Sequence, residues 1–371
     1  MKISLVTPWN VDDPRAWSGV VQPMVRHLRD VADIVVVPCG QEAASPVDRV
    51  AAGAFGRAAG KPYLTGHAVA TARRRGRALT DRLANVTCDV VLGIAASAPL
   101  AYTGTERPIV QVTDATFGAI TGYYPLFTGL PAIVRRQGET IERRSALKTA
   151  GWVVASRWAA NSLMQDYAVH PDKVRVAPFG PATNPTEIRE KAPSKGLRAL
   201  LVTSNWERKG GALALAAVEQ ARAAGTPVQL TVVGDHPVLP DHVTSLGRLP
   251  AERMSQVYAE HDVLLELAAA NAGGVTLTDA AHAGLPVIAT RTGGVPDIVR
   301  DGVSGFLVPV GAEGPVFAAR QLLAMSRPEV HEGLVRGSRQ HARDVLSWDR
   351  WAHQVLEACV QVTEGLPASR G

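Results

Sequence analysis

The sequence predicts an α/β protein built from two doubly wound domains of similar size, and three observations support this. Short apolar segments of strand length alternate with segments of helical period from the start of the chain onward. A polar stretch interrupts this alternation near the middle, and the alternation then restarts. With 371 residues and 46% hydrophobic content, the chain is long enough for two buried cores.

The first domain is predicted to cover residues 1–180. Its expected strands are 2–8, 33–39, 89–94, 108–113, 151–155 and 173–177, and its expected helices are 20–31, 67–85, 131–149 and 157–168. Short apolar strands that alternate with helices are typical of a parallel sheet covered on both faces.

Residues 181–198 are predicted to be a linker, because they are polar, contain three prolines and lack an apolar period. The second domain is predicted over 199–345. Its expected strands are 199–204, 229–234, 262–267, 287–290 and 305–310, and its expected helices are 210–223, 250–260 and 275–283, with a helical tail to about 364. In such sheets ligands bind at the carboxyl ends of strands, so the cleft between the domains is the expected site.

The composition excludes several classes of protein. Charged residues make up 20% of the chain and the net charge is +5, which argues against a disordered chain and gives no reason to expect a nucleic-acid partner. Cys39, Cys88 and Cys359 are far apart and are expected to be free, mostly buried thiols in a reducing compartment. No signal peptide and no membrane span are expected, so we predict a cytoplasmic protein.

The segment TSNWERKGG, residues 203–211, follows a predicted strand and opens a predicted helix. It places Arg208 and Lys209 beside two glycines at a helix N-terminus, an arrangement that suits a diphosphate. The alternative is a solvated pair of cations on an ordinary loop. Because cations are unfavourable at this end of a helix, we favour the anion site.

The segment NAGGVTLTDAAHAG, residues 271–284, is a second glycine-containing helix start. Gly273 and Gly274 would let the backbone approach a ligand, and the N–H groups of Gly274, Val275 and Thr276 are expected to point outward. Asp279 could accept two hydrogen bonds from a cis-diol such as a ribose. Alternatively, Asp279 only complements the helix dipole.

A third glycine pair lies in TRTGGVPDIV, residues 290–299, again after a predicted strand. Three such loops at strand ends of one domain together indicate a nucleotide site. The chain has neither the GxxxxGK[ST] pattern nor the GxGxxG fingerprint, which disfavours a P-loop enzyme and a dehydrogenase.

The second half resembles the retaining GT-B glycosyltransferases of family 4. The resemblance is carried by SNWERKGG, by GGVTLTDAAHAGLPVIATRTGGVPDIVRDGVSGFLV and by ASRWAANSLMQDYAVHPDKVRVAPFG, and it covers most of residues 150–310. It implies the GT-B fold, with two Rossmann-like domains, and a last helix, within 346–371, that crosses back to the first domain. Trp348 and Trp351 in this region are then expected to be packing anchors.

The resemblance also assigns donor-site residues. The family carries two glutamates eight positions apart, one for the donor sugar and one for the ribose; here these positions are Asn271 and Asp279. Asp279 keeps a carboxylate, whereas Asn271 is a departure that puts the usual donor sugar, or full activity, in question. Arg208 and Lys209 match the cations that bind the diphosphate. Arg248 and Leu249 match the segment that contacts the nucleobase.

In the first domain, Gly19 in RAWSGVV resembles the glycine of the family's first loop, which faces donor and acceptor. Asp114 in VTDATF occupies the place where many members have a histidine near the reacting centre. Its carboxylate could accept the acceptor's proton or bind a sugar hydroxyl. The alternative for Asp114 is an Asx turn that caps a loop.

The implied reaction is transfer of a hexose-type sugar from a nucleotide-diphosphate sugar to a small-molecule or lipid-linked acceptor, with retained anomeric configuration. The chain has no DxD element, so no metal and no cofactor other than the nucleotide-sugar co-substrate is expected. Two alternatives stay open. Asn271 motivates a protein that binds a nucleotide sugar without transfer, and a basic tract within 57–82 motivates a transferase on the membrane surface, although a solvated helix face is the favoured explanation of that tract.

Overall fold

The computed structural model describes residues 1–40, 42–58, 63–183 and 196–365. The chain divides into two compact units: unit 1 comprises Met1–Ala177 with Asp349–Gly371, and unit 2 comprises Pro178–Trp348. Each unit holds one six-stranded sheet in which all strand pairs are parallel, so the predicted α/β fold with two parallel sheets is confirmed. Most of the predicted linker 181–198 lies outside the described residues, namely 184–195.

The sheet of unit 1 has the strand order β2-β1-β3-β4-β5-β6. Its strands are β1 (Lys2–Thr7), β2 (Asp33–Pro38), β3 (Val90–Ile94), β4 (Ile109–Thr113), β5 (Gly151–Val154) and β6 (Val174–Val176). All six match predicted strands to within two residues at each end, because buried parallel strands form continuous apolar runs that are easily recognised.

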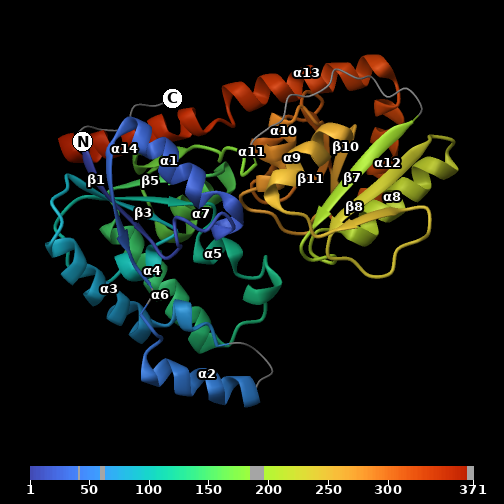
Figure 1. Cartoon of the computed structure of the whole chain (residues 1–371). Helices are drawn as coiled ribbons and strands as arrows, with labels where there is room; N and C mark the ends of the chain where they lie inside the picture. Colours follow the sequence, from blue (N-terminus) through green and yellow to red (C-terminus); the bar gives the residue numbers. More distant parts are fainter. Residues whose placement is uncertain (41, 59–62, 184–195, 366–371) are drawn as a thin grey trace. The chain divides into compact units, whose positions relative to one another are not determined.

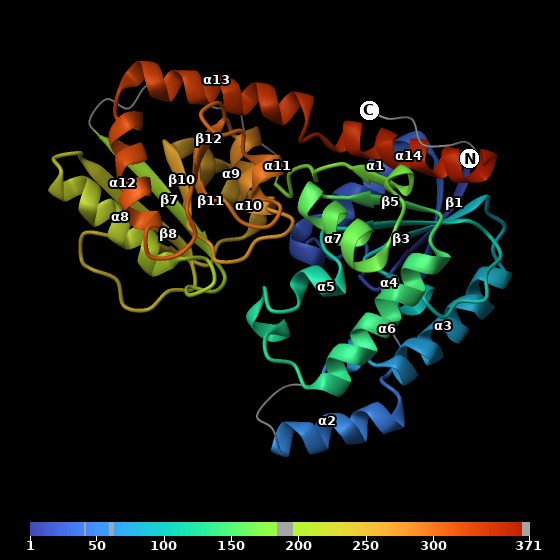
Figure 2. The same ribbon diagram turned by 180° about the vertical axis from the view of Figure 1, so that it is seen from behind.

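Helices cover both faces of this sheet (Figures 1 and 2). One face carries α1 (Val21–Val31) and α14 (Trp348–Glu364), which are joined by the 2.8 Å contact between His27 Nδ1 and Asp349 Oδ1. The other face carries α3 (Val69–Ala84), α4 (Ser97–Leu100), α6 (Ala132–Lys148) and α7 (Arg157–Tyr167). The helices α2 (Pro46–Ala58), α4 and α5 (Phe117–Ile120) were not predicted, because they are short or rich in alanine and glycine.

The sheet of unit 2 has the order β12-β11-β10-β7-β8-β9. Its strands are β7 (Leu197–Thr203), β8 (Val228–Gly234), β9 (Thr244–Gly247), β10 (Val263–Glu266), β11 (Val287–Thr290) and β12 (Gly305–Val308). The edge strand β9 was not predicted, since its sequence TSLG is mostly exposed and lacks an apolar run.

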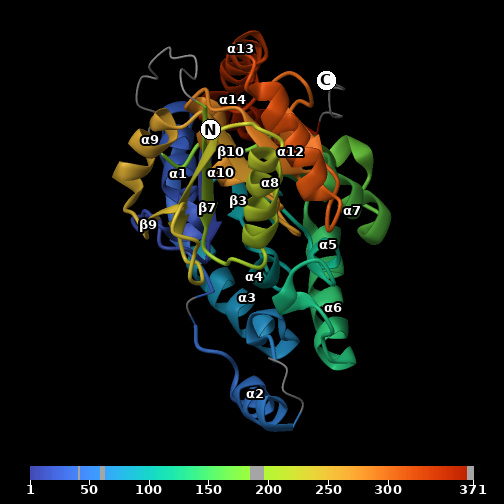
Figure 3. The ribbon, with the colours of Figure 1, turned by 90° about the vertical axis from the view of Figure 1, so that its right-hand side faces the viewer.

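In unit 2, α8 (Gly211–Ala223) and α12 (Gly314–Met325) lie side by side on one face of the sheet (Figure 3). The other face carries α9 (Ala251–Glu260), α10 (Val275–His282), α11 (Val295–Ile298) and, packed on α10, α13 (Pro328–Asp344). Successive residues of β7 enter different cores: Leu201 packs toward α8 and Leu200 toward α10. Against this apolar background, Glu266 is the one charged residue of β10.

Several predictions about buried side chains are confirmed. Cys39, Cys88 and Cys359 are buried free thiols. Trp348 and Trp351 are buried, and the Trp348 indole donates a 2.7 Å hydrogen bond from Nε1 to the carbonyl oxygen of Pro181. Within the described residues, no helix combines the length and the apolar character needed to cross a membrane.

Candidate functional site

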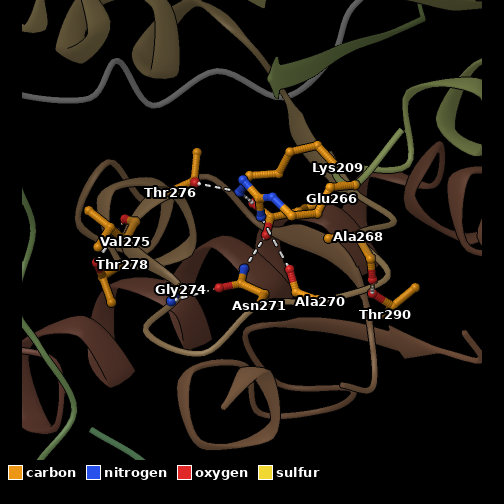
Figure 4. A network of polar contacts seen from close by, with 11 residues as sticks. Lys209, Glu266, Ala268, Ala270, Asn271, Gly274, Val275, Thr276, Thr278 and Thr290 are labelled. Carbon is orange, nitrogen blue, oxygen red and sulfur yellow. Dashed lines mark hydrogen bonds and ion pairs between the residues drawn. The ribbon is translucent and has the colours of Figure 1, made fainter. Parts of the chain in front are cut away.

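Three loops of unit 2 carry the two predicted cations, Asn271 and the two later glycine pairs, and each follows the carboxyl end of a parallel strand. They are residues 204–210 after β7, 267–274 after β10 and 291–294 after β11. Since β7, β10 and β11 are neighbours in the sheet, their loops meet at one edge (Figure 4).

The loop after β7 is held by its own backbone and by Asn205. The Oδ1 atom of Asn205 accepts from the N–H of Arg208 at 2.8 Å, and its carbonyl accepts from Lys209 at 2.9 Å. Gly210 has a φ of +69°, and a Cβ there would lie 2.0 Å from the carbonyl oxygen of Leu267. A glycine is therefore required for the loop to approach the end of β10 this closely.

This approach places both predicted cations over the loop that follows β10. Arg208 Nη1 donates to the carbonyl oxygen of Ala270 at 3.3 Å. Lys209 Nζ lies 3.3 Å from Oγ1 of Thr276, in the first turn of α10, and 3.2 Å from Oε2 of Glu266. Arg208 and Lys209, which the sequence placed at the start of α8, thus also reach the loop before α10 and its first turn, inside unit 2.

The ion pair with Glu266 corrects one step of the sequence argument. We expected that two cations at a helix start would need an external anion, but the protein itself supplies a carboxylate to Lys209. Glu266 was missed because its position lies inside a predicted apolar strand. The signal that could have revealed it is a lone charge at the carboxyl end of DVLLEL.

Asn271 connects Glu266 with the start of α10. Its amide Nδ2 donates to Oε1 of Glu266, and its Oδ1 accepts from the N–H of Gly274 at 2.9 Å (Figure 4). The prediction that the Gly274 N–H points outward is therefore wrong, because the Asn271 side chain caps it. The N–H groups of Val275 and Thr276 remain at the helix start without intrahelical acceptors.

Gly274 at this helix start has a conformational reason to be glycine. Gly274 has a φ of +58°, and a Cβ on it would lie 2.2 Å from Cδ1 of Ile298. Its neighbour Gly273 is buried. In the third glycine pair, the N–H of Gly294 donates to the carbonyl oxygen of Asn271 at 3.1 Å, which ties the loop after β11 to the loop after β10.

Asp279 is buried one turn further along α10. It binds the backbone of residues 182 and 183, a contact that the sequence did not predict. Its Oδ1 accepts from the backbone N–H groups of Ala182 at 2.7 Å and Thr183 at 3.0 Å. Loss of solvent raises the pKa of Asp279 to about 6, although the hydrogen bonds from Thr183 and Ala182 oppose this shift. The carboxylate is therefore more than a partner of the helix dipole.

Arg248 and Leu249 follow β9 and play different parts. The exposed Arg248 guanidinium binds Asp235 with Nε 2.6 Å from Oδ1 and Nη2 2.5 Å from Oδ2, and its hydrogen bond lowers the pKa of Asp235. Leu249 is partly buried against the core on the α10 face of the sheet. Both residues follow the carboxyl end of β9, so their backbone lies at the same edge of the sheet as the three loops.

Comparison with known proteins places this geometry in a family. The sequence profile described as Glycosyl transferases group 1 matches residues 198–325, the region that contains all three loops. The chain is a glycosyltransferase, and its unit 2 carries the group 1 profile. The predicted resemblance is therefore confirmed.

Two curated relatives show how far the likeness extends. The putative colanic acid biosynthesis glycosyltransferase WcaL of Salmonella typhimurium is 27% identical over 175 residues, which cover 42% of this chain and 43% of that protein. The phosphatidyl-myo-inositol mannosyltransferase of Mycobacterium tuberculosis is 29% identical over 335 residues, covering 84% of this chain and 83% of that protein.

Among solved structures, Anabaena Alr3699/HepE in complex with UDP and glucose superimposes with a TM-score of 0.64 at 15% identity. The match covers 97% of this chain and 100% of that one. At this identity the likeness shows the fold alone, and together with the two parallel sheets it shows the GT-B fold.

In this glycosyltransferase, the remaining predicted residues belong to unit 1. Gly19 ends a short loop in which Trp17, Ser18 and Gly19 all have positive φ, at 46°, 61° and 87°. Such backbone is costly for the two residues that are not glycine, and strained backbone of this kind concentrates at functional sites.

Asp114 directly follows β4 and is partly buried. Loss of solvent raises its pKa to about 6, while its own backbone N–H acts in the opposite direction. The helix that follows is capped by Thr116, whose hydroxyl accepts from the N–H of Ala119 at 3.1 Å. The turn therefore has its own cap, which weakens the explanation of Asp114 as a capping residue.

Part of the basic tract contacts other groups of unit 1 in the glycosyltransferase. Arg82 Nη2 lies 2.6 Å from Glu42 Oε1, and Arg73 lies over the ring of Tyr102 at 5.6 Å. On α3, the apolar residues Ala72, Leu79 and Leu83 are buried in the core, and so is Ala68 directly before the helix. This face is not available to insert into a lipid surface. Two members of the tract have side chains outside the description, namely Arg57 and Lys61.

Proposed function

We propose that this glycosyltransferase moves a hexose-type sugar from a nucleotide-diphosphate sugar to a small-molecule or lipid-linked acceptor, with retention of anomeric configuration. One observation carries the proposal: Arg208 and Lys209 extend over the start of α10, where Lys209 Nζ lies 3.3 Å from Thr276 Oγ1. Two cations and N–H groups that have no acceptor within the helix then converge on one position, which suits a diphosphate.

The leaving diphosphate develops negative charge as the bond to the sugar breaks. Arg208, Lys209 and the N–H groups of Val275 and Thr276 would stabilise this charge, and each such group is typically worth about 100- to 1000-fold in rate. The sugar then passes through an oxocarbenium-like state without a protein nucleophile, and the acceptor attacks from the same face. A metal ion is not needed for this scheme.

The other donor contacts follow from the same edge of the sheet. Asp279 would accept a hydrogen bond from a ribose hydroxyl, since a carboxylate has about four acceptor positions, of which the backbone N–H groups of Ala182 and Thr183 and the Thr183 side chain use three. Gly273 and Gly274 would lie against the sugar diphosphate, and Asn271 against a sugar hydroxyl. The backbone at Arg248 and Leu249 would contact the nucleobase.

In unit 1, Asp114 is proposed to receive the proton of the acceptor hydroxyl or to bind a sugar hydroxyl, and Gly19 to face donor and acceptor. A pKa of about 6 makes the Asp114 carboxylate a usable base at neutral pH, because it is ionised there yet more basic than an ordinary aspartate.

The name of one curated relative suggests a lipid acceptor to test. The Mycobacterium tuberculosis relative acts, by its name, on phosphatidyl-myo-inositol. Phosphatidylinositol is therefore the first lipid-linked acceptor to test, beside small polyols and sugars.

A donor panel tests the proposal. Purified protein is incubated with UDP-, GDP-, ADP- and dTDP-sugars, with and without acceptor and with EDTA, and release of the nucleoside diphosphate is measured. We expect turnover with at least one donor, an α-linked product from an α-linked donor, and no loss in EDTA. Nucleotide binding without turnover by any donor and acceptor would leave only a binding protein, and no binding at all would refute the proposed site.

A further inference from the structure

Glu266 is a buried acid at the centre of the proposed donor site to which no role has yet been given. It ends β10, its side chain is 2% exposed, and it lies directly before the loop that leads to α10. The other three residues of the strand are apolar. An acid at such a position is costly unless specific partners compensate for its burial.

The first partner of Glu266 is Lys209. Its Nζ lies 3.2 Å from Oε2 of Glu266, and the Lys209 side chain is only 12% exposed. Both charges are therefore largely removed from water and face one another. The positive charge of the Lys209 ammonium, which would bind the diphosphate, is therefore partly balanced by the Glu266 carboxylate.

The second partner is Asn271. Its Nδ2 donates to Oε1 of Glu266 while its Oδ1 accepts from the N–H of Gly274 at 2.9 Å. The opposite amide orientation would place Oδ1 against the carboxylate and the NH₂ group against an N–H, so the contacts fix one orientation. A carboxylate at 271 would face the carboxylate of Glu266, and the Lys209 ammonium would then have two acids beside it. The residue types at 266 and 271 are thus interdependent.

We propose that Glu266 is a positioning residue of the donor site. Its carboxylate orients the Lys209 ammonium and the Asn271 amide, and it sets how much positive charge the diphosphate of the donor meets. This inference rests on the proposed function, because it assumes that Lys209 contacts the diphosphate. It also gives Asn271 a reason to be an amide in this chain.

The proposal predicts opposite effects on binding and on transfer. E266Q keeps the shape of the side chain and removes its charge, so Lys209 presents a fuller positive charge. We expect the affinity for a free nucleoside diphosphate to rise about three- to tenfold at low salt, with a smaller gain at high salt. We expect kcat with the sugar donor to fall at least tenfold, because Lys209 and Asn271 lose their orientation.

Calorimetric titration with UDP, GDP, ADP and dTDP, together with donor kinetics, tests this pattern. The matched control is D262N, which removes the charge of the buried carboxylate just before the other end of β10, where Asp262 Oδ1 binds Arg198 Nη2 at 2.8 Å. D262N is expected to leave affinity and kcat per folded molecule unchanged. A merely structural Glu266 would lower nucleotide affinity and stability together in E266Q, and that result, or unchanged affinity, overturns the proposal.

A second variant keeps the proposal testable if E266Q folds poorly. The exchange E266Q/N271D preserves one acid, one amide and one ammonium. We expect N271D alone to lower the unfolding midpoint by about 3 to 6 °C, and the exchange to recover at least half of that loss. If the unfolding midpoint of E266Q/N271D falls by the sum of the losses in E266Q and N271D, the two positions are not interdependent and the proposal is overturned.

The two proposals fail in distinguishable ways. If the wild type binds none of the four nucleotides, the proposed function fails and the inference fails with it. If the wild type binds a nucleotide while E266Q does not tighten that binding, the donor site stands and only the role of Glu266 is overturned.

Discussion

The two ends of strand β10 each have a buried carboxylate, and the protein holds them in different ways. Asp262, just before the strand, accepts from the backbone N–H of Arg198 at 2.8 Å and from its Nε and Nη2 at 3.0 and 2.8 Å. Glu266, at the other end, is held by a lysine from one loop and an asparagine from another.

This difference separates a structural end of the sheet from a binding end. Arg198 belongs to the neighbouring strand β7, so its ion pair with Asp262 links two adjacent strands and is complete without a further group. The partners of Glu266 come from loops that also carry Arg208 and the start of α10. Ligands of parallel α/β sheets bind outside the carboxyl ends of strands, and the composition of the two ends follows that rule.

The largest expected effect comes from Lys209 at the binding end. K209A should lower kcat/KM about 100- to 1000-fold, because it removes one of the groups that stabilise the leaving diphosphate. The matched control is R222A, which removes an exposed cation from the last turn of α8, the helix that Lys209 precedes. Steady-state kinetics measure kcat/KM for both variants. An equal fall in kcat/KM in K209A and R222A would show a general effect of charge and not a specific role of Lys209.

The structural end should respond in stability and not in activity. D262N leaves the Arg198 guanidinium without its anionic partner, and we expect the free energy of unfolding to fall by about 2 kcal/mol. This figure allows for the 42% exposure of the Arg198 side chain, which can still be hydrated. Urea denaturation measures the loss. A fall in kcat for the folded fraction would erase the distinction between the ends.

Asp279 offers a sharper test of the binding end. D279N keeps an oxygen that can accept from Ala182 and Thr183, so stability should change by less than about 1 kcal/mol. The preference for a ribonucleoside diphosphate over its 2′-deoxy form should shrink about tenfold, because the charged acceptor of the ribose is lost. Titration with both nucleotides measures this. An unchanged preference would show that Asp279 binds only residues 182 and 183 of the protein and not the ribose.

The smallest expected effect is a change in pH dependence from unit 1. With a pKa of about 6, Asp114 is a carboxylate above pH 6 and protonated below it, so kcat at saturating donor should fall as the pH drops through 6. Because this pKa is raised from 3.8, protonation of Asp114 stabilises the fold over the same range, and unfolding through this group does not explain the fall. D114N should lower kcat and remove the acid limb. A limb that persists in D114N belongs to another group.

Eleven of the twelve strands in the described residues were predicted, because most of them are apolar runs of the kind found in parallel sheets covered on both faces. The sequence singled out Arg208, Lys209 and the glycine loops because cations at a helix start are unfavourable to the helix dipole and glycines allow a close backbone approach. It missed Glu266 because the residue lies inside a predicted apolar strand and its two partners come from two different loops, which spacing does not reveal. For the same reason it missed the cap that Asn271 places on Gly274 and the contact between Asp279 and residues 182 and 183.

Hydrogen exchange with and without a bound nucleoside diphosphate tests the central claim most directly, because it reports on both ends of the sheet in one measurement. We predict slower exchange at residues 205–210 and at the amides of Val275 and Thr276. Exchange at Arg198 and Asp262 should stay unchanged. Protection that appears at the Asp262 end, or that omits both loops at the Glu266 end, would contradict the assignment of the donor site.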